Sequence, residues 1–304
     1  MMIPESQLST WANIGATEAA NSTYTSIKAA IDAAKSKSLK NYSYDVYLQG
    51  SYRNSTSIYG DMDVDVVVEA TDFFYRDIDD LTEAQKEEYK RQYSGTTDNS
   101  FDGFRSAIET ALTEYYGSGL VTLRSKCILI EGKSGRLDAD VVPCVTYRDY
   151  RKNEAVKLPN PEVGITFWTR TKPRQVINYP KQHYDNGVTK NKNTSERFKP
   201  AVRIFKNLRN YCVTNNLVAA DVAPSYFVSC LIYNAPNEAF KRSYQDTVLA
   251  ILNWMYALTD EQWDKLLCQN DLYYLCRDVP DLWPRANAKK FKTAAISAWN
   301  DWGK

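Results

Sequence analysis

The stretch LQGSYRNSTSIYGDMDVDVVVEA, residues 48–70, decides the fold and the chemistry expected of this chain. It begins within one predicted strand, YDVYLQGSY, which runs into a turn at Gly50 and Ser51, and it ends in a second predicted strand. Because alternate side chains of a strand share a face, Asp63 and Asp65 should project together while Val64 and Val66 point into the core. Two carboxylates placed side by side destabilise each other unless a cation compensates their charge.

An isolated D-x-D is also typical of an acidic turn before an edge strand, so further elements are needed. A third predicted strand, GRLDADVVPC at residues 135–144, carries Asp138 and Asp140 on one face. Asp140 is the better candidate of the two, because its neighbours are more apolar and Pro143 closes the strand just beyond it. The sequence therefore predicts an acidic site built from Asp63, Asp65 and Asp140.

The Gly-Ser pair adds a phosphate-binding element to this acidic pattern. Glycine lets the backbone approach a ligand closely, and a serine hydroxyl with adjacent N–H groups can bind phosphate oxygens. Gly50 and Ser51 come about a dozen residues before Asp63, and the third acidic strand follows later. The three parts together form a far more specific pattern than any one of them.

Composition narrows the chemistry further. The 304 residues include a single histidine, His183, and six cysteines that are far apart without a C-x-x-C pair. A multi-histidine metal site is therefore impossible, and we interpret the cysteines as reduced, mostly buried thiols. His183 is expected to be structural or exposed rather than catalytic. Catalysis would depend on carboxylates, hydroxyls and cations, which favours oxygen-binding metals such as Mg²⁺.

Charge and hydropathy limit the partners and the location. The formal net charge of +1 argues against long nucleic acid as the main partner, since such domains usually carry a marked basic excess. The first 35 residues lack the basic start and continuous apolar run of a signal peptide. We therefore expect a cytoplasmic protein with no membrane segment.

The order of predicted elements indicates an α+β chain with two domains. A long helix is expected over residues 8–37, followed by alternating strands and helices to about residue 147. Residues 147–192 are rich in Pro, Asn, Lys and Tyr and are predicted to be a loop-rich connection with short strands. Nearly everything after them has helical periodicity. The predicted domains are residues 1–170, a catalytic core with a brace helix, and residues 171–304, the connection and a helical lobe.

The acidic and Gly-Ser elements resemble known motifs. Gly50-Ser51, Asp63-x-Asp65 and Asp140 are similar to the h-G-[GS], [DE]-h-[DE] and h-[DE]-h elements of the polymerase-β nucleotidyltransferase superfamily. More narrowly, GSYRNSTSIYGDMDVDVVVE, ADVVPC, YPKQHYDNG and RFKPAVRIFKNLR resemble bacterial cGAS/DncV-like nucleotidyltransferases, the CD-NTases of CBASS anti-phage systems. Clade E, the CdnE type, is the most similar. The resemblance extends to at least Ala235, and the remaining residues match only as a helical tail.

This resemblance implies a polymerase-β-like core, with a mixed sheet and flanking helices, plus a C-terminal helical lobe and an active site in the interlobe cleft. It also implies that Asp63, Asp65 and Asp140 hold two Mg²⁺ ions, for which Mn²⁺ can substitute. Gly50 and Ser51 would contact the terminal phosphates of the donor nucleotide.

Other nucleotide contacts are expected on the predicted helix from Glu196, where Lys199, Arg203 and Lys206 share one face. The alternative is a solvated basic face, whereas the resemblance implies that Lys206 grips the triphosphate.

Asn178 and Tyr179 lie where relatives contact the base. Asparagine can read a base edge and tyrosine can stack on a base, although a plain loop contact is the alternative.

The implied function is a cyclic dinucleotide synthase that joins two nucleoside triphosphates, ATP and UTP, and releases pyrophosphate. Its product would be a messenger for anti-phage defence, acting with a CBASS accessory partner; the uridine expectation rests on Asn178 alone. One rival keeps the fold and transfers nucleotides to RNA or protein, which the near-neutral charge disfavours. A second rival is an inactive nucleotide-binding module, which the intact Asp63, Asp65 and Asp140 disfavour.

Overall fold

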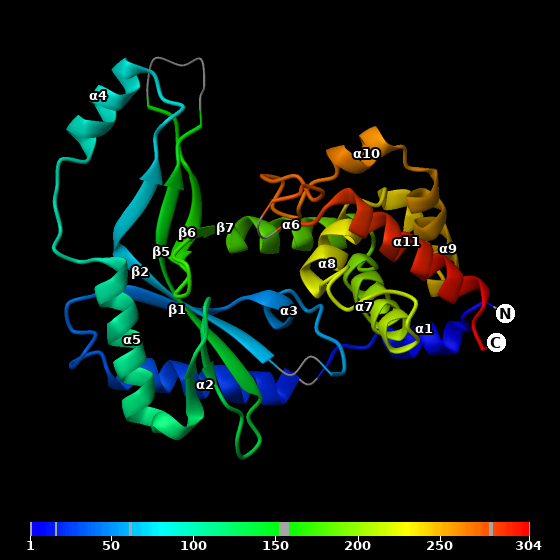
Figure 1. The fold of residues 1–304 in the computed structure, drawn as a ribbon, viewed down its shortest axis with the longest axis horizontal. Helices are drawn as coiled ribbons and strands as arrows, with labels where there is room; N and C mark the ends of the chain where they lie inside the picture. Colours follow the sequence, from blue (N-terminus) through cyan, green and yellow to red (C-terminus); the bar gives the residue numbers. More distant parts are fainter. Residues whose placement is uncertain (1, 16, 61–62, 152–157, 280–281, 304) are drawn as a thin grey trace. The chain divides into compact units, whose positions relative to one another are not determined.

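The computed structural model describes residues 2–15, 17–60, 63–151, 158–279 and 282–303 (Figure 1). It divides into two compact units, which we call the sheet unit and the helical unit. The sheet unit comprises Glu18–Gln49 and Met62–Pro180, and the helical unit comprises Met1–Thr17, Gly50–Asp61 and Lys181–Lys304. These units divide the chain differently from the two continuous segments predicted, because two short N-terminal segments belong to the helical unit.

The sheet unit is built on one mixed sheet. Its strands are β1 (Tyr44–Leu48), β2 (Asp63–Asp77), β3 (Val121–Leu123), β4 (Ile128–Ile130), β5 (Asp138–Asp149), β6 (Glu162–Trp168) and β7 (Gln175–Asn178). The order is β1-β2-β5-β4-β3, and β6 pairs with β5 and β7. Only β2 and β5 run parallel among these pairs, and both are long strands at the middle of the sheet (Figure 1). The predicted mixed sheet with flanking helices is confirmed.

Two helices, α2 (Thr17–Ala33) and α5 (Phe101–Tyr116), cover one face of this sheet. They are joined by a hydrogen bond of 2.8 Å between the hydroxyls of Ser26 and Tyr116. Pro143 of β5 lines a pocket with side chains of α5, and it is in register with Val68 of β2. The face of β2 that carries Val64, Val66 and Val68 is therefore the helix-covered face, and Asp63 and Asp65 project from the opposite one.

The prediction of a continuous helix over residues 8–37 is wrong. The structure has α1 (Glu5–Trp11) in the helical unit and begins α2 at Thr17, with residue 16 outside the described part. Gly15 explains the break. Its N–H donates to the Ser57 carbonyl at 3.0 Å, and a Cβ at this position would lie 2.6 Å from the Ile58 carbonyl oxygen. The backbone at Gly15 lies so close to residues 55–58 that a side chain does not fit there, and the helix is interrupted at this point.

The other sequence predictions for the first 180 residues can be judged element by element. Helix α4 (Glu83–Gln92) and helix α5 lie where helical spacing predicts helices. Strands β6 and β7 are the short strands predicted in the connection. Short 3₁₀ turns occupy Ser118–Leu120 and Asn237–Ala239. The predicted loop-rich connection is wrong over its last part, since Pro180–Asn193 forms helix α6. Proline is favoured at the first turn of a helix, where its missing N–H costs nothing.

The helical unit packs around α7 (Phe198–Thr214). Besides α1 and α6, the unit contains α3 (Gly50–Arg53), α8 (Ser225–Tyr233), α9 (Tyr244–Ala257), α10 (Asp260–Lys265) and α11 (Arg285–Asn300). Helix α7 contacts α1, α8, α9 and α11, and its buried side chains recur at helical spacing, as the sequence predicts. Glu5 of α1 accepts hydrogen bonds from the N–H groups of Tyr244 and Gln245 at the start of α9, a position that favours a carboxylate.

Candidate active site

The central feature of the sheet unit is the register between β2 and β5. Asp63 pairs with Asp138 and Asp65 pairs with Asp140, in parallel orientation. Residues opposite each other on adjacent strands lie on the same face, and the strands are about 5 Å apart. The three predicted aspartates, Asp63, Asp65 and Asp140, are therefore brought to one face of the sheet, although Asp65 and Asp140 are more than seventy positions apart in the sequence.

The structure also distinguishes the two acids of β5. An oxygen of Asp138 accepts a hydrogen bond from the Gly132 N–H at 2.7 Å, which ties this carboxylate to the preceding loop. Asp140 has a side chain that is 19% exposed, and its Oδ1 accepts a hydrogen bond of 3.4 Å from Arg124. Asp140 is thus the less exposed acid and the direct neighbour of Asp65, which supports preferring it as a metal ligand.

Chemistry and geometry both bear on whether these aspartates can bind divalent cations. Their oxygens are the ligands that Mg²⁺ prefers, and neighbouring positions on one sheet face bring them within reach of shared ions. In the part of the chain that the structure describes, however, no three His, Cys, Asp or Glu side chains already stand together as a metal-binding group. Because like charges repel, the carboxylates gain nothing by converging until a cation is bound. The residues fit the ions by their position on one sheet face and by their chemistry, and their role as metal ligands stays a prediction.

Two neighbours of Asp140 were not singled out from the sequence. Arg124 follows β3 and pairs with Asp140, and the Cys127 thiol lies beside the same carboxylate. Burial raises the pKa of Cys127 to about 12, and the negative charge of Asp140 adds to this effect. Cys127 is therefore a neutral thiol at neutral pH. All six cysteines are free, as the sequence predicts. No local motif could have revealed either neighbour, because both contacts depend on strand pairing.

The Gly-Ser pair lies in the helical unit and forms the short helix α3. Gly50 has a φ of 66°, a left-handed value that glycine adopts without strain. Its carbonyl accepts hydrogen bonds from the Asn54 side chain at 2.7 Å and from the Asn54 N–H at 3.2 Å. The Ser51 carbonyl accepts from the Thr56 N–H at 2.9 Å, and the Ser51 side chain is half-buried. The predicted turn is therefore a fixed structural element.

The basic residues of α7 have unequal surroundings. Lys206 is only 2% exposed, and its Nζ donates to the Thr56 carbonyl at 3.0 Å. The Arg203 guanidinium donates to the carbonyls of Ala12 and Ser55. These two cations hold the N-terminal and α3 segments against α7, and burial lowers the pKa of Arg203. Their assignment to nucleotide binding stays a prediction.

Lys199 is the half-buried member of this basic set. Burial lowers the pKa of Lys199, and the positive charges of Arg203 and Arg53 lower it further, whereas Glu196 acts in the opposite direction. Burial is the largest cause of this lowered pKa, and the charge of Glu196 opposes the charges of Arg203 and Arg53. The assignment of Lys199 to nucleotide binding stays a prediction.

The two candidate base-reading residues also differ. Asn178 ends β7, pairs with Ile165 and is half-buried. Tyr179 is 2% exposed, and its hydroxyl donates to Asp149 at 3.0 Å. The buried ring of Tyr179 presents no face for stacking on a base, so the stacking expected of it is not supported. The predicted role of Asn178 in reading a base edge stays a prediction.

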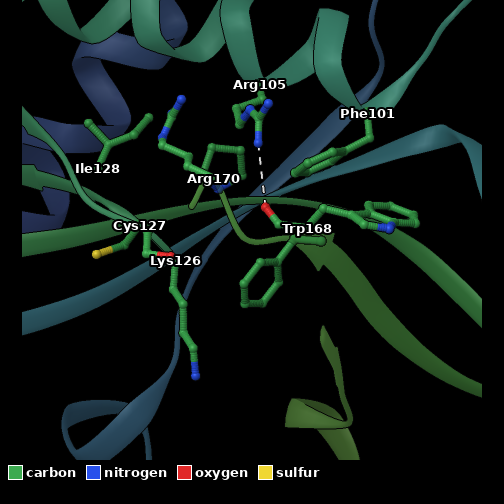
Figure 2. A pocket seen from close by; sticks show the side chains of 10 residues that line it. Phe101, Arg105, Lys126, Cys127, Ile128, Trp168 and Arg170 are labelled. Atoms are coloured by element: carbon green, nitrogen blue, oxygen red, sulfur yellow. Dashed lines mark hydrogen bonds between the residues drawn. The ribbon is translucent and has the colours of Figure 1, made fainter. Parts of the chain in front are cut away.

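Two other features of the structure stand apart from these candidates. Figure 2 shows a pocket in the sheet unit lined by aromatic and basic side chains, where Arg105 donates to the Trp168 carbonyl at 3.4 Å. The cavity has room for about one water molecule.

His183 lies on α6 and stacks on Tyr226, with ring centroids 5.3 Å apart, which supports a structural role.

Comparison with known proteins decides the family. Residues 185–300 match the model of the cGAS/DncV-like nucleotidyltransferase C-terminal helical domain. The cyclic UMP-AMP synthase of Rhodothermus marinus (strain SG0.5JP17-172) is 40% identical to this chain over 303 residues, which cover 100% of both proteins. This chain belongs to the cGAS/DncV-like nucleotidyltransferases.

Other members of this family agree with that placement. The cyclic nucleotide synthase CdnE01 of Staphylococcus haemolyticus is 32% identical over 99% of this chain and 100% of its own length. The structure of the Rhodothermus marinus CdnE c-UMP-AMP synthase with Apcpp and Upnpp superposes with a TM-score of 0.85 at 38% identity, covering 99% of this CD-NTase and 98% of that chain. The predicted resemblance to the CdnE type is confirmed. No helix among the described residues of this CD-NTase is both long and apolar enough to cross a membrane.

Proposed function

We propose that this CD-NTase is a cytoplasmic, metal-dependent cyclic dinucleotide synthase that joins two nucleoside triphosphates and releases pyrophosphate. One structural observation carries the proposal: the parallel pairing of Asp65 with Asp140, with Asp63 on the same sheet face. Three carboxylates in this arrangement suit the binding of two cations in a phosphoryl-transfer site. The relatives whose names state an activity are cyclic nucleotide synthases, which supports the same reaction here.

The reaction has a balanced course in which the residues of this chain take defined roles. The 3'-hydroxyl oxygen of one nucleotide forms a bond to the α-phosphorus of the other, and the bond from that phosphorus to the pyrophosphate oxygen breaks. Asp63 and Asp65 would hold the cations, and a carboxylate oxygen of Asp140 would accept or orient the hydroxyl proton. When bound, Mg²⁺ or Mn²⁺ neutralises charge on the attacking and leaving oxygens. A second attack closes the ring.

Substrate choice is the finer part of the proposal. We assign ATP and UTP as substrates and a uridine-containing product, with Asn178 reading the pyrimidine edge. A side-chain amide offers both a donor and an acceptor, which matches the mixed edge of uracil. The name of the Rhodothermus marinus relative, a cyclic UMP-AMP synthase, supports this choice. The product would act as a messenger in anti-phage defence, with a CBASS accessory protein as partner, as the family resemblance implies.

One experiment tests the activity directly. The purified chain is incubated with all four labelled nucleoside triphosphates and Mg²⁺ or Mn²⁺, and products that resist phosphatase are identified by mass. A cyclic product that contains uridine and adenosine is expected, and it should disappear when EDTA is present. A phosphatase-sensitive linear product, or incorporation of label into added RNA or protein, would contradict the proposal. The variant with Asp63 and Asp65 both changed to Asn supplies the inactive control.

A further inference from the structure

Glu69 of β2 is a buried carboxylate that connects three strands of the sheet. The residue is only 2% exposed. Its Oε2 accepts a hydrogen bond of 2.8 Å from the Tyr47 hydroxyl on β1, and its Oε1 accepts one of 2.7 Å from the Thr146 hydroxyl on β5. Strands β1 and β5 are the two neighbours of β2 in the sheet. One side chain therefore fixes β2 to both of its neighbours.

This connection lies on the sheet face that carries the candidate metal ligands. Glu69 follows Asp65 by four residues in β2, and Thr146 follows Asp140 by six residues in β5. Even spacings keep side chains on the same face of a strand. At the rise of a strand, Glu69 and Asp65 are roughly 13 Å apart along β2. Any effect of Glu69 on the aspartates must therefore pass through the strands and not through direct contact.

The register between β2 and β5 changes directly after this connection. Ala70 pairs with Val145 and Phe74 pairs with Thr146, so β2 has three residues between these pairs where β5 has none. A bulge disrupts the ladder of hydrogen bonds locally, and a register error of one residue turns side chains to the other face. The Thr146 hydroxyl also lies 3.4 Å from the Ala70 carbonyl oxygen. Thr146 thus binds the part of β2 before the bulge, although its own register partner comes after it.

We propose that Glu69 is a positioning residue for the nucleotidyl-transfer reaction. By its bonds to β1 and β5 it keeps Asp65 of β2 opposite Asp140, so that the aspartates can share cations. The inference rests on the proposed function, because that function requires bound cations. Burial raises the pKa of Tyr47, so the Tyr47 hydroxyl stays protonated and remains a donor to Glu69. Ligands of a functional site must be held within about 0.5 Å of their productive geometry, so loosened strands should weaken cation binding.

Cation binding and turnover are measured together to test this role. Mn²⁺ affinity is determined by electron paramagnetic resonance without nucleotide, and kcat and KM are determined with nucleoside triphosphates and Mg²⁺. Thr146→Val removes one hydroxyl donor to Glu69, Thr146→Ser keeps it, and Glu69→Gln removes the charge of the acceptor. The matched control is Thr166→Val, because Thr166 is buried and its hydroxyl donates at 3.0 Å to the Val176 carbonyl, between β6 and β7 of the same sheet. Thermal unfolding shows that each variant is folded.

The positioning role predicts a specific pattern of losses. Thr146→Val and Glu69→Gln should weaken Mn²⁺ binding about tenfold, at the lower end of outer-shell effects, and should lower kcat more than they raise KM. Thr146→Ser and Thr166→Val should bind Mn²⁺ like the parent.

The role of Glu69 is overturned by parental Mn²⁺ affinity in Thr146→Val, by an equal loss in Thr166→Val, or by a parent that does not bind Mn²⁺. A parent that binds Mn²⁺ but makes no cyclic dinucleotide overturns the proposed function instead. Selective loss of Mn²⁺ binding in Thr146→Val would then still support the role of Glu69.

Discussion

Asp65 of β2 and Asp140 of β5 are directly opposite each other in a parallel register, although 74 positions separate them in the sequence. The spacing of adjacent strands puts their backbones about 5 Å apart. Asp63 shares their face because it lies two residues before Asp65. This relationship brings the Asp63-x-Asp65 motif and the Asp140 motif together into one candidate metal-binding surface.

Replacing both Asp63 and Asp65 with Asn should abolish metal-dependent turnover of nucleoside triphosphates. The fold should persist, because Asp63 is exposed, Asp65 is only half-buried, and amides of the same shape remove charge repulsion. Product formation by thin-layer chromatography and thermal unfolding would be measured together. Asp45→Asn, a change at an exposed acid of neighbouring β1, is the control and should retain parental activity. Product from the double variant would end the metal-site hypothesis.

The two acids of β5 should differ sharply in their effect on activity. Asp140→Asn should lower kcat/KM by more than about 100-fold, since loss of a metal ligand exceeds the roughly 10–100-fold effect of outer-shell changes. Asp138→Asn should have little effect on activity, because its side-chain carbonyl can still accept the Gly132 hydrogen bond. Steady-state kinetics on both variants decides the matter. The reverse order of losses would refute the choice of Asp140.

Asn178→Ser should change base selection more than rate. A site that hydrogen-bonds a pyrimidine edge penalises a base that leaves its groups unpaired, and serine removes that pattern. Incorporation should shift from UTP towards ATP, with total turnover reduced less than in any of the aspartate variants. Competition between labelled nucleotides measures the product ratio. If the ratio equals that of the parent, Asn178 is only a β7 residue and not a specificity determinant.

Replacing Lys206 should change the stability of the fold more than it changes nucleotide binding. Lys206→Met leaves the Thr56 carbonyl without the ammonium donor, which should lower the free energy of unfolding by about 1–3 kcal/mol. Lys192→Met, at an exposed position of α6, is the matched control and should change it little. Urea unfolding without nucleotide gives both values. Parental stability combined with weakened ATP binding would instead favour the triphosphate contact expected from the sequence.

His183 should make the stability of the chain fall as the pH falls below 6.5. Burial lowers the pKa of the imidazole from 6.5 to about 4, and its Nδ1 has no hydrogen-bond partner among the described residues. Between these pH values the unfolded chain binds the proton and the folded chain does not, so protonation favours unfolding. The full loss by pH 4 is roughly 3 kcal/mol, at about 1.4 kcal/mol per pKa unit.

The measurement is the free energy of unfolding at pH 7 and at pH 5, where most carboxylates are still ionised. The parent should lose stability over this interval, and His183→Phe should lose distinctly less, because His183 is the only histidine in the sequence. Equal slopes for the two proteins would show that the imidazole is not held neutral by the fold.

The sequence by itself determined the local features of this protein. Alternating Val and Asp in residues 63–66 fixed which side chains of β2 share a face, and the apolar spacing of α7 fixed its buried side, because both follow from backbone periodicity. The motifs also sufficed to indicate the family. Free cysteines, the mixed sheet and the helical C-terminal region could be predicted for the same local reasons.

Only the tertiary structure decided what depends on contacts between distant segments. Local periodicity does not predict the β2–β5 register or the hydrogen bonds of Asp138 with Gly132 and of Asp140 with Arg124. It does not predict the burial of Lys206 and Tyr179 either. The break between α1 and α2 likewise follows from the close approach of Gly15 to the 55–58 segment. Secondary structure depends mainly on neighbouring residues, whereas strand pairing and side-chain burial depend on which residues from distant parts of the sequence pack alongside.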